Sequence, residues 1–121
     1  MQEKYYKYAK VLLEKGLCIN KEEPLVINAP IESVDFIRVL TEVACSLGVN
    51  DIYYDWYDDD LKHTCLKYYD ETSIKNSRFW NKSIHDEYAK KHAAFLFLVS
   101  SNPSIMNDID SKKLKTFFSN I

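Results

Sequence analysis

The chain has 121 residues, of which 46% are hydrophobic and 28% are charged, and its formal net charge at pH 7 is -2. This composition is typical of one soluble globular domain and excludes an intrinsically disordered chain. The 16 basic and 18 acidic residues are spread along the sequence, so no basic patch indicates nucleic-acid binding. No apolar run reaches the roughly 20 residues that span a bilayer, and the N-terminus MQEKYYKYAK lacks the features of a signal peptide. We therefore expect no membrane association and a cytoplasmic location.

The three cysteines show neither a disulfide pattern nor a zinc pattern. Cys18, Cys45 and Cys65 are odd in number and include no CxxC pair. Cysteines in a cytoplasmic protein stay reduced. We expect free thiols that pack as small hydrophobic residues.

The first predicted elements are a helix and a strand. Residues 3–16 carry an apolar stripe flanked by lysines, and Gly16 stands where a glycine ends many helices. After a polar connection, Pro24 precedes the apolar run LVINA, and proline is tolerated at the start of a strand. The sequence therefore predicts an amphipathic helix over 3–16 and a strand over about 25–29.

A second helix and a second strand follow. Pro30 suits the first position of a helix, because its missing N–H would have no partner there. Apolar residues such as Ile31 and Leu40 then recur at helical spacing up to Gly48, which predicts the end of the helix. The run at 52–56 is predicted as a strand. Strand, helix and strand in this order form a βαβ unit, whose two strands are parallel.

The next part of the chain is predicted to be helical with one interruption. Asp58 is the predicted N-cap of a helix that runs to Tyr68, because an aspartate oxygen can accept the unpaired N–H groups of the first turn. Residues 69–78 lack periodicity and are rich in polar side chains, which predicts a loop. Helical spacing resumes over 79–92.

A third strand completes the predicted sheet. The unbroken apolar run AAFLFLV at 93–99 is typical of a strand that is covered on both faces, so we place it near the centre of the sheet. A polar tip at 100–103 and a final helix over 110–121 are expected to follow. The elements together predict an α/β fold, a three-layer open sheet with a mainly parallel core of at least three strands, at about 25–29, 52–56 and 93–99, flanked by helices.

Local spacing does not bring metal ligands together. His85 and His92 are about 10.5 Å apart along a helix that rises 1.5 Å per residue, which is too far to bind one ion. His63 and Cys65 point in different directions on a helix. We interpret the histidines as isolated surface or cap residues. The motifs GxSxG, GxxxxGK[ST] and GxGxxG are also absent, and the chain has only two glycines.

Polar residues gather where the predicted strands end. In open α/β sheets, ligands bind beyond the carboxyl ends of the strands. These residues could form a ligand site there, or they could serve only as helix caps and turns. A receiver-like phosphoacceptor domain fits poorly, because such a domain needs an acidic pair after its first strand, where this chain has an asparagine and an alanine. The candidate ligand side comprises Asn28, Asp55, Asp58, Ser100 and Asn102.

Two motifs carry a family resemblance. The first strand ends in Asn-Ala-Pro at 28–30, and the second ends in Asp-Trp-Tyr-Asp-Asp at 55–59. Between them lies the apolar helix that ends near Gly48, and Trp80 and the Asn-Pro tip at 102–103 extend the match. With these motifs, the sequence resembles the N-terminal domain of the thermophilic-type metallo-aminopeptidases, the group that includes aminopeptidases T and S, over essentially its whole length.

The resemblance implies a dimeric cytoplasmic enzyme that removes N-terminal amino acids from peptides with two divalent metal ions of zinc or cobalt type. It also implies that the metal ligands belong to a C-terminal catalytic domain outside residues 1–121, because none of the three histidines matches them. We therefore expect residues 1–121 to be a single non-catalytic α/β domain, with no catalytic or metal-binding residue and no cofactor of its own. Its implied partners are the C-terminal domain of the same chain, a second subunit and peptide substrates.

Two other functions stay open from the residues alone. The chain could be a free-standing small-ligand binding or regulatory module that uses the candidate ligand side. It could also be an interaction domain whose interface is the apolar segment 112–121.

Overall fold

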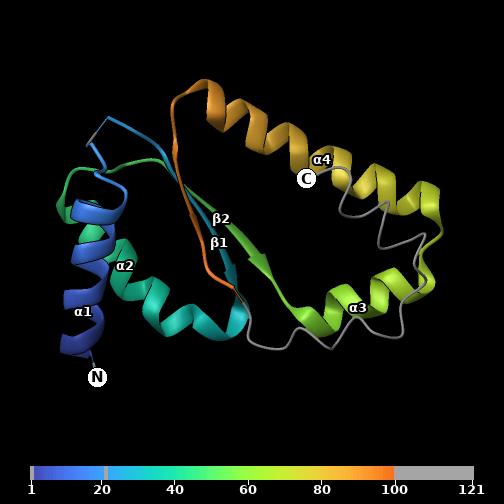
Figure 1. Ribbon diagram of the computed structural model, residues 1–121, viewed down its shortest axis with the longest axis horizontal. Coiled ribbons are helices and arrows are strands. Elements are labelled where there is room, and N and C mark those ends of the chain that lie inside the picture. The colour runs from blue at the N-terminus through green and yellow to red at the C-terminus, as the bar shows by residue number, and fades with distance from the viewer. Residues whose placement is uncertain (1, 21, 100–121) are drawn as a thin grey trace.

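The computed structural model describes residues 2–20 and 22–99 (Figure 1). Helices and strands alternate along most of this part of the chain, as the βαβ pattern predicts. The elements in order are α1 (Gln2–Val11), a π-helical turn (Leu12–Gly16), β1 (Leu25–Pro30), a 3-10 turn (Ile31–Ser33), α2 (Val34–Ser46), β2 (Ile52–Tyr57), α3 (Asp59–Tyr68), α4 (Glu71–Lys90) and β3 (Ala94–Phe97).

The three strands form one parallel sheet in the order β2-β1-β3, which confirms the predicted fold class. The prediction that the strand at 93–99 lies near the centre is wrong for the part of the chain described, where β1 is central and β3 is at an edge. Leu25, Val26 and Ile27 of β1 are at most 1% exposed. The residues of β3 are half-buried up to Phe97, which is exposed. An apolar run indicates that both faces of a strand are covered, but it does not indicate whether the strand is central or at an edge of the sheet.

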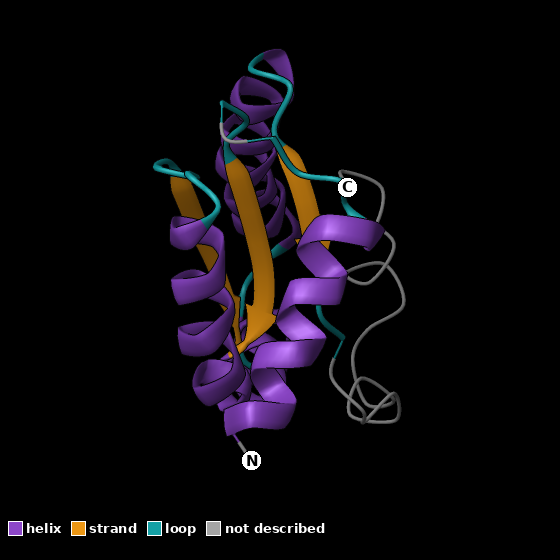
Figure 2. Cartoon of the chain, turned by 90° about the vertical axis from the view of Figure 1, so that its left-hand side faces the viewer, coloured by secondary structure: helices purple, strands orange, loops and turns teal. Residues whose placement is uncertain are grey.

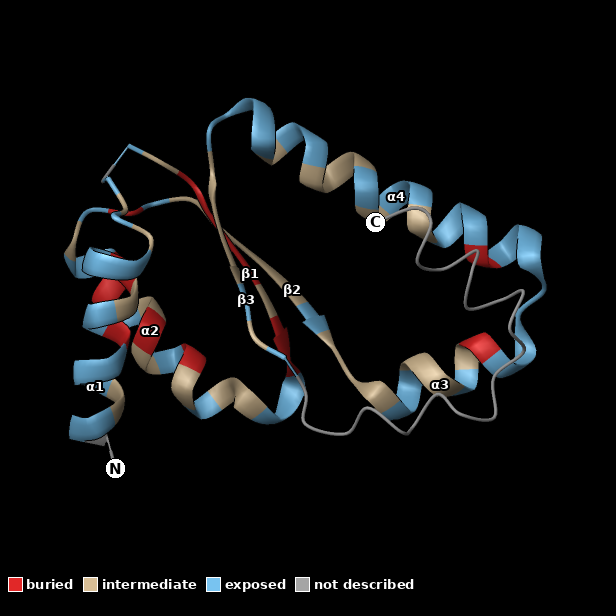
Figure 3. Ribbon diagram, viewed as in Figure 1, coloured by how far each residue is buried: buried red, intermediate tan, exposed pale blue. Residues whose placement is uncertain are grey.

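The sheet lies between two layers of helices (Figure 2). Helices α1 and α2 cover one face, and α4 lies behind the other. The main core is on the α1 and α2 side, and Figure 3 shows most buried residues gathered there. Phe36 of α2 also packs against the rings of Tyr5 and Tyr8, each with a centroid distance of 5.5 Å. The buried core residues are Ala9, Leu13, Leu25, Ile27, Ala29, Ile37, Leu40, Val43, Ala44 and Val49.

The opposite face meets α4 through aromatic and polar side chains. Tyr53 of β2 stacks on Tyr88 of α4 with a centroid distance of 5.5 Å, and the Tyr88 hydroxyl donates to Asp51 Oδ1 at 3.2 Å. Phe95 of β3 lies 5.8 Å from the His85 ring. This layer therefore depends more on specific polar contacts than the α1 and α2 layer does.

Helix ends follow the predictions only in part. Gly48 ends α2 with a φ of 96°, a conformation that glycine adopts without strain. The helix predicted over 3–16 ends at Gly16 as expected, because Gly16 is the last residue of the π-helical turn that continues α1. Gly16 does not take the left-handed conformation of a glycine stop, however, and the residue with positive φ after this turn is Cys18, at 49°. Pro30 is the last residue of β1 and the N-cap of the 3-10 turn, one position earlier than predicted.

The loop predicted over 69–78 is wrong, because α4 already begins at Glu71. Asp70 is its N-cap and accepts a hydrogen bond from the Ser73 backbone N–H at 2.7 Å. In the first two turns only Ile74 is buried. The polar residues that suggested a loop are the exposed face of a helix that has a single apolar anchor.

Some expectations concern other parts of the chain. The polar tip at 100–103 and the final helix over 110–121 lie outside the described residues. All three cysteines are free thiols, as predicted, but Cys18 and Cys45 are exposed and do not pack as core residues. Within residues 2–20 and 22–99, no helix combines the length and the apolar character needed to cross a membrane.

Candidate functional site

Two residues of the predicted ligand side meet at the carboxyl ends of neighbouring strands. Asn28 of β1 and Asp55 of β2 are partners in the parallel register. The Asn28 Nδ2 donates a hydrogen bond to Asp55 Oδ2 at 2.9 Å. The contact follows from the alternation of side chains along a strand, because partners in a parallel ladder project to the same face.

Two further donors reach the same carboxylate oxygen from α4. His85 Nε2 lies 3.2 Å from Asp55 Oδ2, and Asn81 Nδ2 donates to it at 3.4 Å. The side chains of His85 and Asp55 are 25% and 15% exposed. We call Asn28, Asp55, Asn81 and His85 the Asp55 cluster. It joins β1, β2 and α4 through a single oxygen atom.

Sequence reasoning missed Asn81 and His85, and its interpretation of His85 as an isolated surface or cap residue is wrong. These residues are four positions apart, so they lie on the same face of a helix, and Tyr88 continues that face toward β2. The spacing was visible in the sequence. The acceptor was not, because Asp55 lies 26 and 30 positions earlier in the chain.

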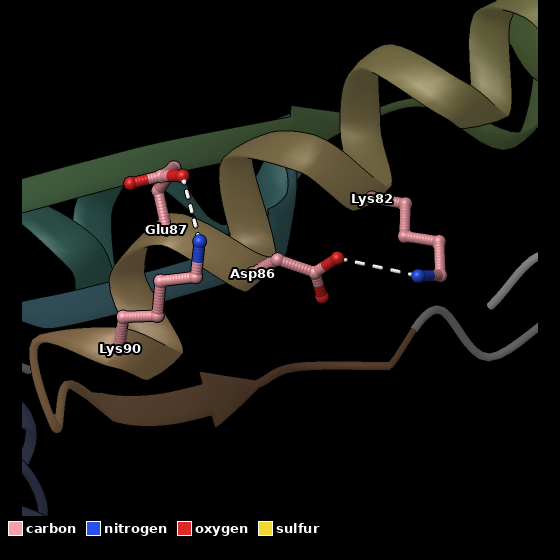
Figure 4. Close-up of polar contacts among 4 residues, drawn as sticks. All are labelled: Lys82, Asp86, Glu87 and Lys90. Carbon is pink, nitrogen blue, oxygen red and sulfur yellow. Dashed lines mark hydrogen bonds and ion pairs between the residues drawn. The ribbon is translucent and has the colours of Figure 1, made fainter.

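The outer face of α4 has a different character (Figure 4). There Lys82 pairs with Asp86 at 3.2 Å and Lys90 pairs with Glu87 at 3.3 Å, with all four side chains more than half exposed. Exposed ion pairs of this kind contribute little to stability. The inward polar stripe therefore distinguishes the two faces of the helix.

Two half-buried cations lie near the Asp55 cluster. Burial lowers the pKa of the Arg78 guanidinium, and the negative charge of Asp55 opposes that shift. Burial also lowers the pKa of the Lys62 ammonium, and the positive charge of Arg78 lowers it further. The negative charges of Asp59 and Asp55 oppose this shift. The Lys62 Nζ stands 4.5 Å above the ring of Tyr57. The carboxylate of Asp55 thus offsets part of the cost of keeping these cations out of water.

The other residues of the predicted ligand side do not join the cluster. Asp58 is the N-cap of α3, as predicted, and its Oδ2 accepts the Leu61 backbone N–H at 3.0 Å. Ser100 and Asn102 lie outside the described residues. The ligand side therefore remains a prediction that rests on Asn28 and Asp55.

The surface has two hollows, one that includes Lys62 and Arg78 and one against α1. A cavity of about 230 Å³ between α3 and α4 has the apolar Leu66 and Ile74 and the cationic Lys62 and Arg78 among its lining residues. A shallow groove of about 590 Å³ against α1 is lined by Tyr5, Tyr8, Phe36 and two lysines. The α1 groove includes no residue of the Asp55 cluster.

The described residues do not fit a two-metal centre. Among residues 2–20 and 22–99, no three or more histidine, cysteine, aspartate or glutamate side chains converge on a common point. Divalent ions in hydrolytic centres take several such ligands each. No catalytic step can be derived through a metal held by this part of the chain.

The chain matches the family model described as thermophilic metalloprotease (M29) over residues 1–120. The chain belongs to this family. The match confirms the resemblance predicted from the Asn-Ala-Pro and Asp-Trp-Tyr-Asp-Asp motifs. It also agrees with the predicted relation to metal-dependent aminopeptidases, because the similar proteins of known function are aminopeptidases.

Two relatives show how much of such a protein this chain represents. It is 30% identical to aminopeptidase AmpS of Bacillus subtilis (strain 168) over 110 residues, which cover 91% of this chain and 27% of the relative. It is 27% identical to aminopeptidase 2 of Geobacillus stearothermophilus over 110 residues, with the same coverage of 91% and 27%. The chain therefore spans about a quarter of the length of these M29 aminopeptidases.

A solved structure supports the fold. Wild-type AmpT from Thermus thermophilus superposes with a TM-score of 0.82 at 24% sequence identity. The superposition covers 98% of this chain and 30% of that protein. The α/β arrangement of this M29 chain is thus the arrangement found in one part of that longer protein.

Proposed function

We propose that residues 1–121 form the N-terminal, non-catalytic domain of a metal-dependent aminopeptidase that removes N-terminal amino acids from peptides. One observation carries the proposal. The M29 match runs over residues 1–120, yet the chain corresponds to only 27% of the length of aminopeptidase AmpS. On this proposal, the metal-binding domain follows in the remaining length of the polypeptide.

The proposed parent enzyme is cytoplasmic and homodimeric, and it acts on peptides with two divalent ions of zinc or cobalt type. Such ions polarise the scissile carbonyl and lower the pKa of a bound water. Within this chain, the described residues supply no ligand set for them. The contribution of residues 1–121 is therefore structural, and they provide a surface against which the catalytic domain packs.

The Asp55 cluster supports that role. Its hydrogen bonds from Asn28, Asn81 and His85 join the central strand, an edge strand and α4 at the carboxyl end of the sheet. Polar groups that are half-buried and mutually bonded hold one arrangement of their elements. The cluster would keep this edge in a fixed shape beside peptide substrates, and Asn28 and Asp55 are the residues proposed to face them.

The proposal is tested by comparing residues 1–121 with the polypeptide that continues in the same reading frame. Each is incubated with Zn²⁺ or Co²⁺ and assayed with leucine p-nitroanilide and with leucyl peptides. We expect hydrolysis by the longer polypeptide alone. Equilibrium dialysis should show no binding of either metal by residues 1–121 at micromolar concentration. Metal-dependent release of amino acids by residues 1–121 would contradict a non-catalytic role.

A second candidate function is a small-ligand binding or regulatory module. The observation in its favour is the pairing of Asn28 with Asp55 at the carboxyl edge of a parallel sheet, where ligands of such folds bind. A thermal-shift screen of residues 1–121 against nucleotides, phosphates and amino acids separates the two proposals. A specific ligand raises the melting temperature because it binds only the folded state. That result, lost on substitution of Asn28, would favour the module over the aminopeptidase domain.

A further inference from the structure

The open edge of β3 lacks the features that protect exposed edge strands. Edge strands that face water carry charged residues, prolines or bulges that prevent pairing with another strand. β3 consists of Ala94, Phe95, Leu96 and Phe97, and Leu98 and Val99 follow it without any charge. Phe97 and Val99 are 57% and 86% exposed. This composition is that of an interior strand in an edge position.

The hydrogen-bond directions identify the unpaired groups. Ala94 N–H donates to Pro24 O and Leu98 N–H donates to Asn28 O, both at 2.8 Å, so these residues face β1. Backbone groups alternate between the two sides of a strand, and in a parallel ladder every second residue faces one neighbour. The backbone N–H and C=O groups of Phe95 and Phe97 therefore point to the open side. Within residues 22–99, no strand lies there.

The opposite edge of the sheet differs. β2 contains Asp55, and Asp51 and Asp58 flank it on either end. Acidic residues of this kind discourage pairing with a further strand. The order β2-β1-β3 also forms the beginning of the common doubly wound order 2-1-3-4-5, in which the second strand is an edge and the third is interior. Both observations favour growth of the sheet at β3 and not at β2.

We propose that the open side of β3 receives a further parallel strand, supplied by the region that follows this chain in the longer M29 aminopeptidases. The inference rests on the proposed function, because it assigns the partner to the remaining length of the parent enzyme. Aminopeptidase AmpS has 73% of its length outside the matched part, as 100% minus 27%. A parallel connection needs about a dozen residues or more, and the chain continues for 22 residues after Val99. β3 is thus the strand through which residues 1–121 contact the region that follows them.

Amide hydrogen exchange tests the pairing directly. We compare residues 1–121 with the polypeptide continued in frame, and we measure protection at Phe95 and Phe97, with Leu96 as the internal control that faces β1. In residues 1–121, Leu96 should be protected, and Phe95 and Phe97 should exchange rapidly. In the longer polypeptide, protection at Phe95 and Phe97 should rise by about 100-fold or more, because a paired edge opens only with the sheet.

Substitution of Phe97 provides the second measurement. Phe97→Pro removes the N–H, while Phe97→Ala removes the same ring and keeps the N–H. Proline is tolerated where a strand N–H faces solvent and is disruptive where it is paired. In residues 1–121 the two variants should have equal melting temperatures. In the longer polypeptide, Phe97→Pro should melt at a lower temperature than Phe97→Ala.

The outcomes separate this inference from the proposed function. Slow exchange of Phe95 and Phe97 already in residues 1–121 would overturn the assignment, because the pairing strand would then come from this chain. Equal behaviour of the two Phe97 variants in the longer polypeptide would also overturn it. Peptidase activity without added protection at β3 would support the proposed function and contradict the pairing of a further strand with β3. Added protection without peptidase activity would support the pairing at β3 and contradict the proposed function.

Discussion

Removal of the Asp55 carboxylate is the sharpest test of how the α4 layer is held. Asp55→Ala leaves the donors of Asn28, Asn81 and His85 without their acceptor. A hydrogen bond to a charged group is worth about 1.5 to 3 kcal/mol when it is short and buried. All three bonds are only partly buried, and only the bond from Asn28, at 2.9 Å, is short, since the other two are 3.2 and 3.4 Å long. We expect the free energy of unfolding to fall by about 2 to 3 kcal/mol.

Two matched variants sharpen the measurement. Asp55→Asn keeps the shape and one acceptor oxygen, so we expect a loss of about 1 kcal/mol. Asp86→Ala removes an aspartate from the exposed face of α4, where the side chain is 57% exposed and pairs with Lys82 (Figure 4). An exposed ion pair contributes about 0 to 1 kcal/mol, so this control should change stability by about 0.5 kcal/mol or less.

Urea denaturation followed by circular dichroism gives the free energy of unfolding of each variant from the midpoint and the slope. An unchanged slope shows that the native and unfolded states keep their compactness. If Asp55→Ala loses no more stability than Asp86→Ala, the cluster does not hold α4 to the sheet and the reasoning fails.

Three further predictions concern the core, a helix cap and the dependence on pH. Leu40→Ala, at a side chain that is 0% exposed, should lower the free energy of unfolding by about 2 to 5 kcal/mol in urea, and a loss below 1 kcal/mol would mean that α2 is not packed as described. Asp70→Ala should lower the free energy of unfolding by about 1 kcal/mol in the same assay, because the Ser73 N–H loses its acceptor. An unchanged free energy of unfolding would instead favour the loop predicted over 69–78. Burial raises the pKa of the Tyr88 phenol above its ordinary value of about 10, and Asp51 raises it further. Since the folded state holds this proton more tightly, its contribution to stability is present below pH 10 and is lost as the pH rises through the folded pKa. Tyr88→Phe should therefore weaken the fall of stability in alkaline solution, and an unchanged alkaline profile by circular dichroism would count against it.

Much of the fold follows from local pattern. The apolar run before Pro30, the helical spacing up to Gly48 and the cap at Asp58 each predict an element that the structure confirms. The observed register of the two parallel strands then places Asn28 beside Asp55. Local pattern failed at 69–78, because a helix with one buried residue has almost no amphipathic signal. It placed the end of the first helix correctly at Gly16, although a Cβ there would meet nothing closer than 4.0 Å and glycine is not required.

The candidate site was only half predictable. The strand ends could be found because polar residues interrupt apolar runs there. Asn81 and His85 could not be assigned to the site, because their acceptor is distant in the chain and their helix was expected to start eight residues later than it does. Contacts between distant segments depend on the packing of whole elements, and no short pattern encodes them.

By itself, the sequence determined the βαβ pattern, the family and the side of the sheet where polar residues end the strands, because these depend on neighbours within a few turns or on motifs preserved in order. For residues 2–20 and 22–99, only the tertiary structure decided that β1 is the central strand and β3 an edge, that one oxygen of Asp55 joins three elements, and that no strand of this described part pairs with the far side of β3. The physical reason is that strand order and shared hydrogen bonds are set by how complete elements pack, and an apolar run has the same sequence pattern in a central strand as in an edge strand.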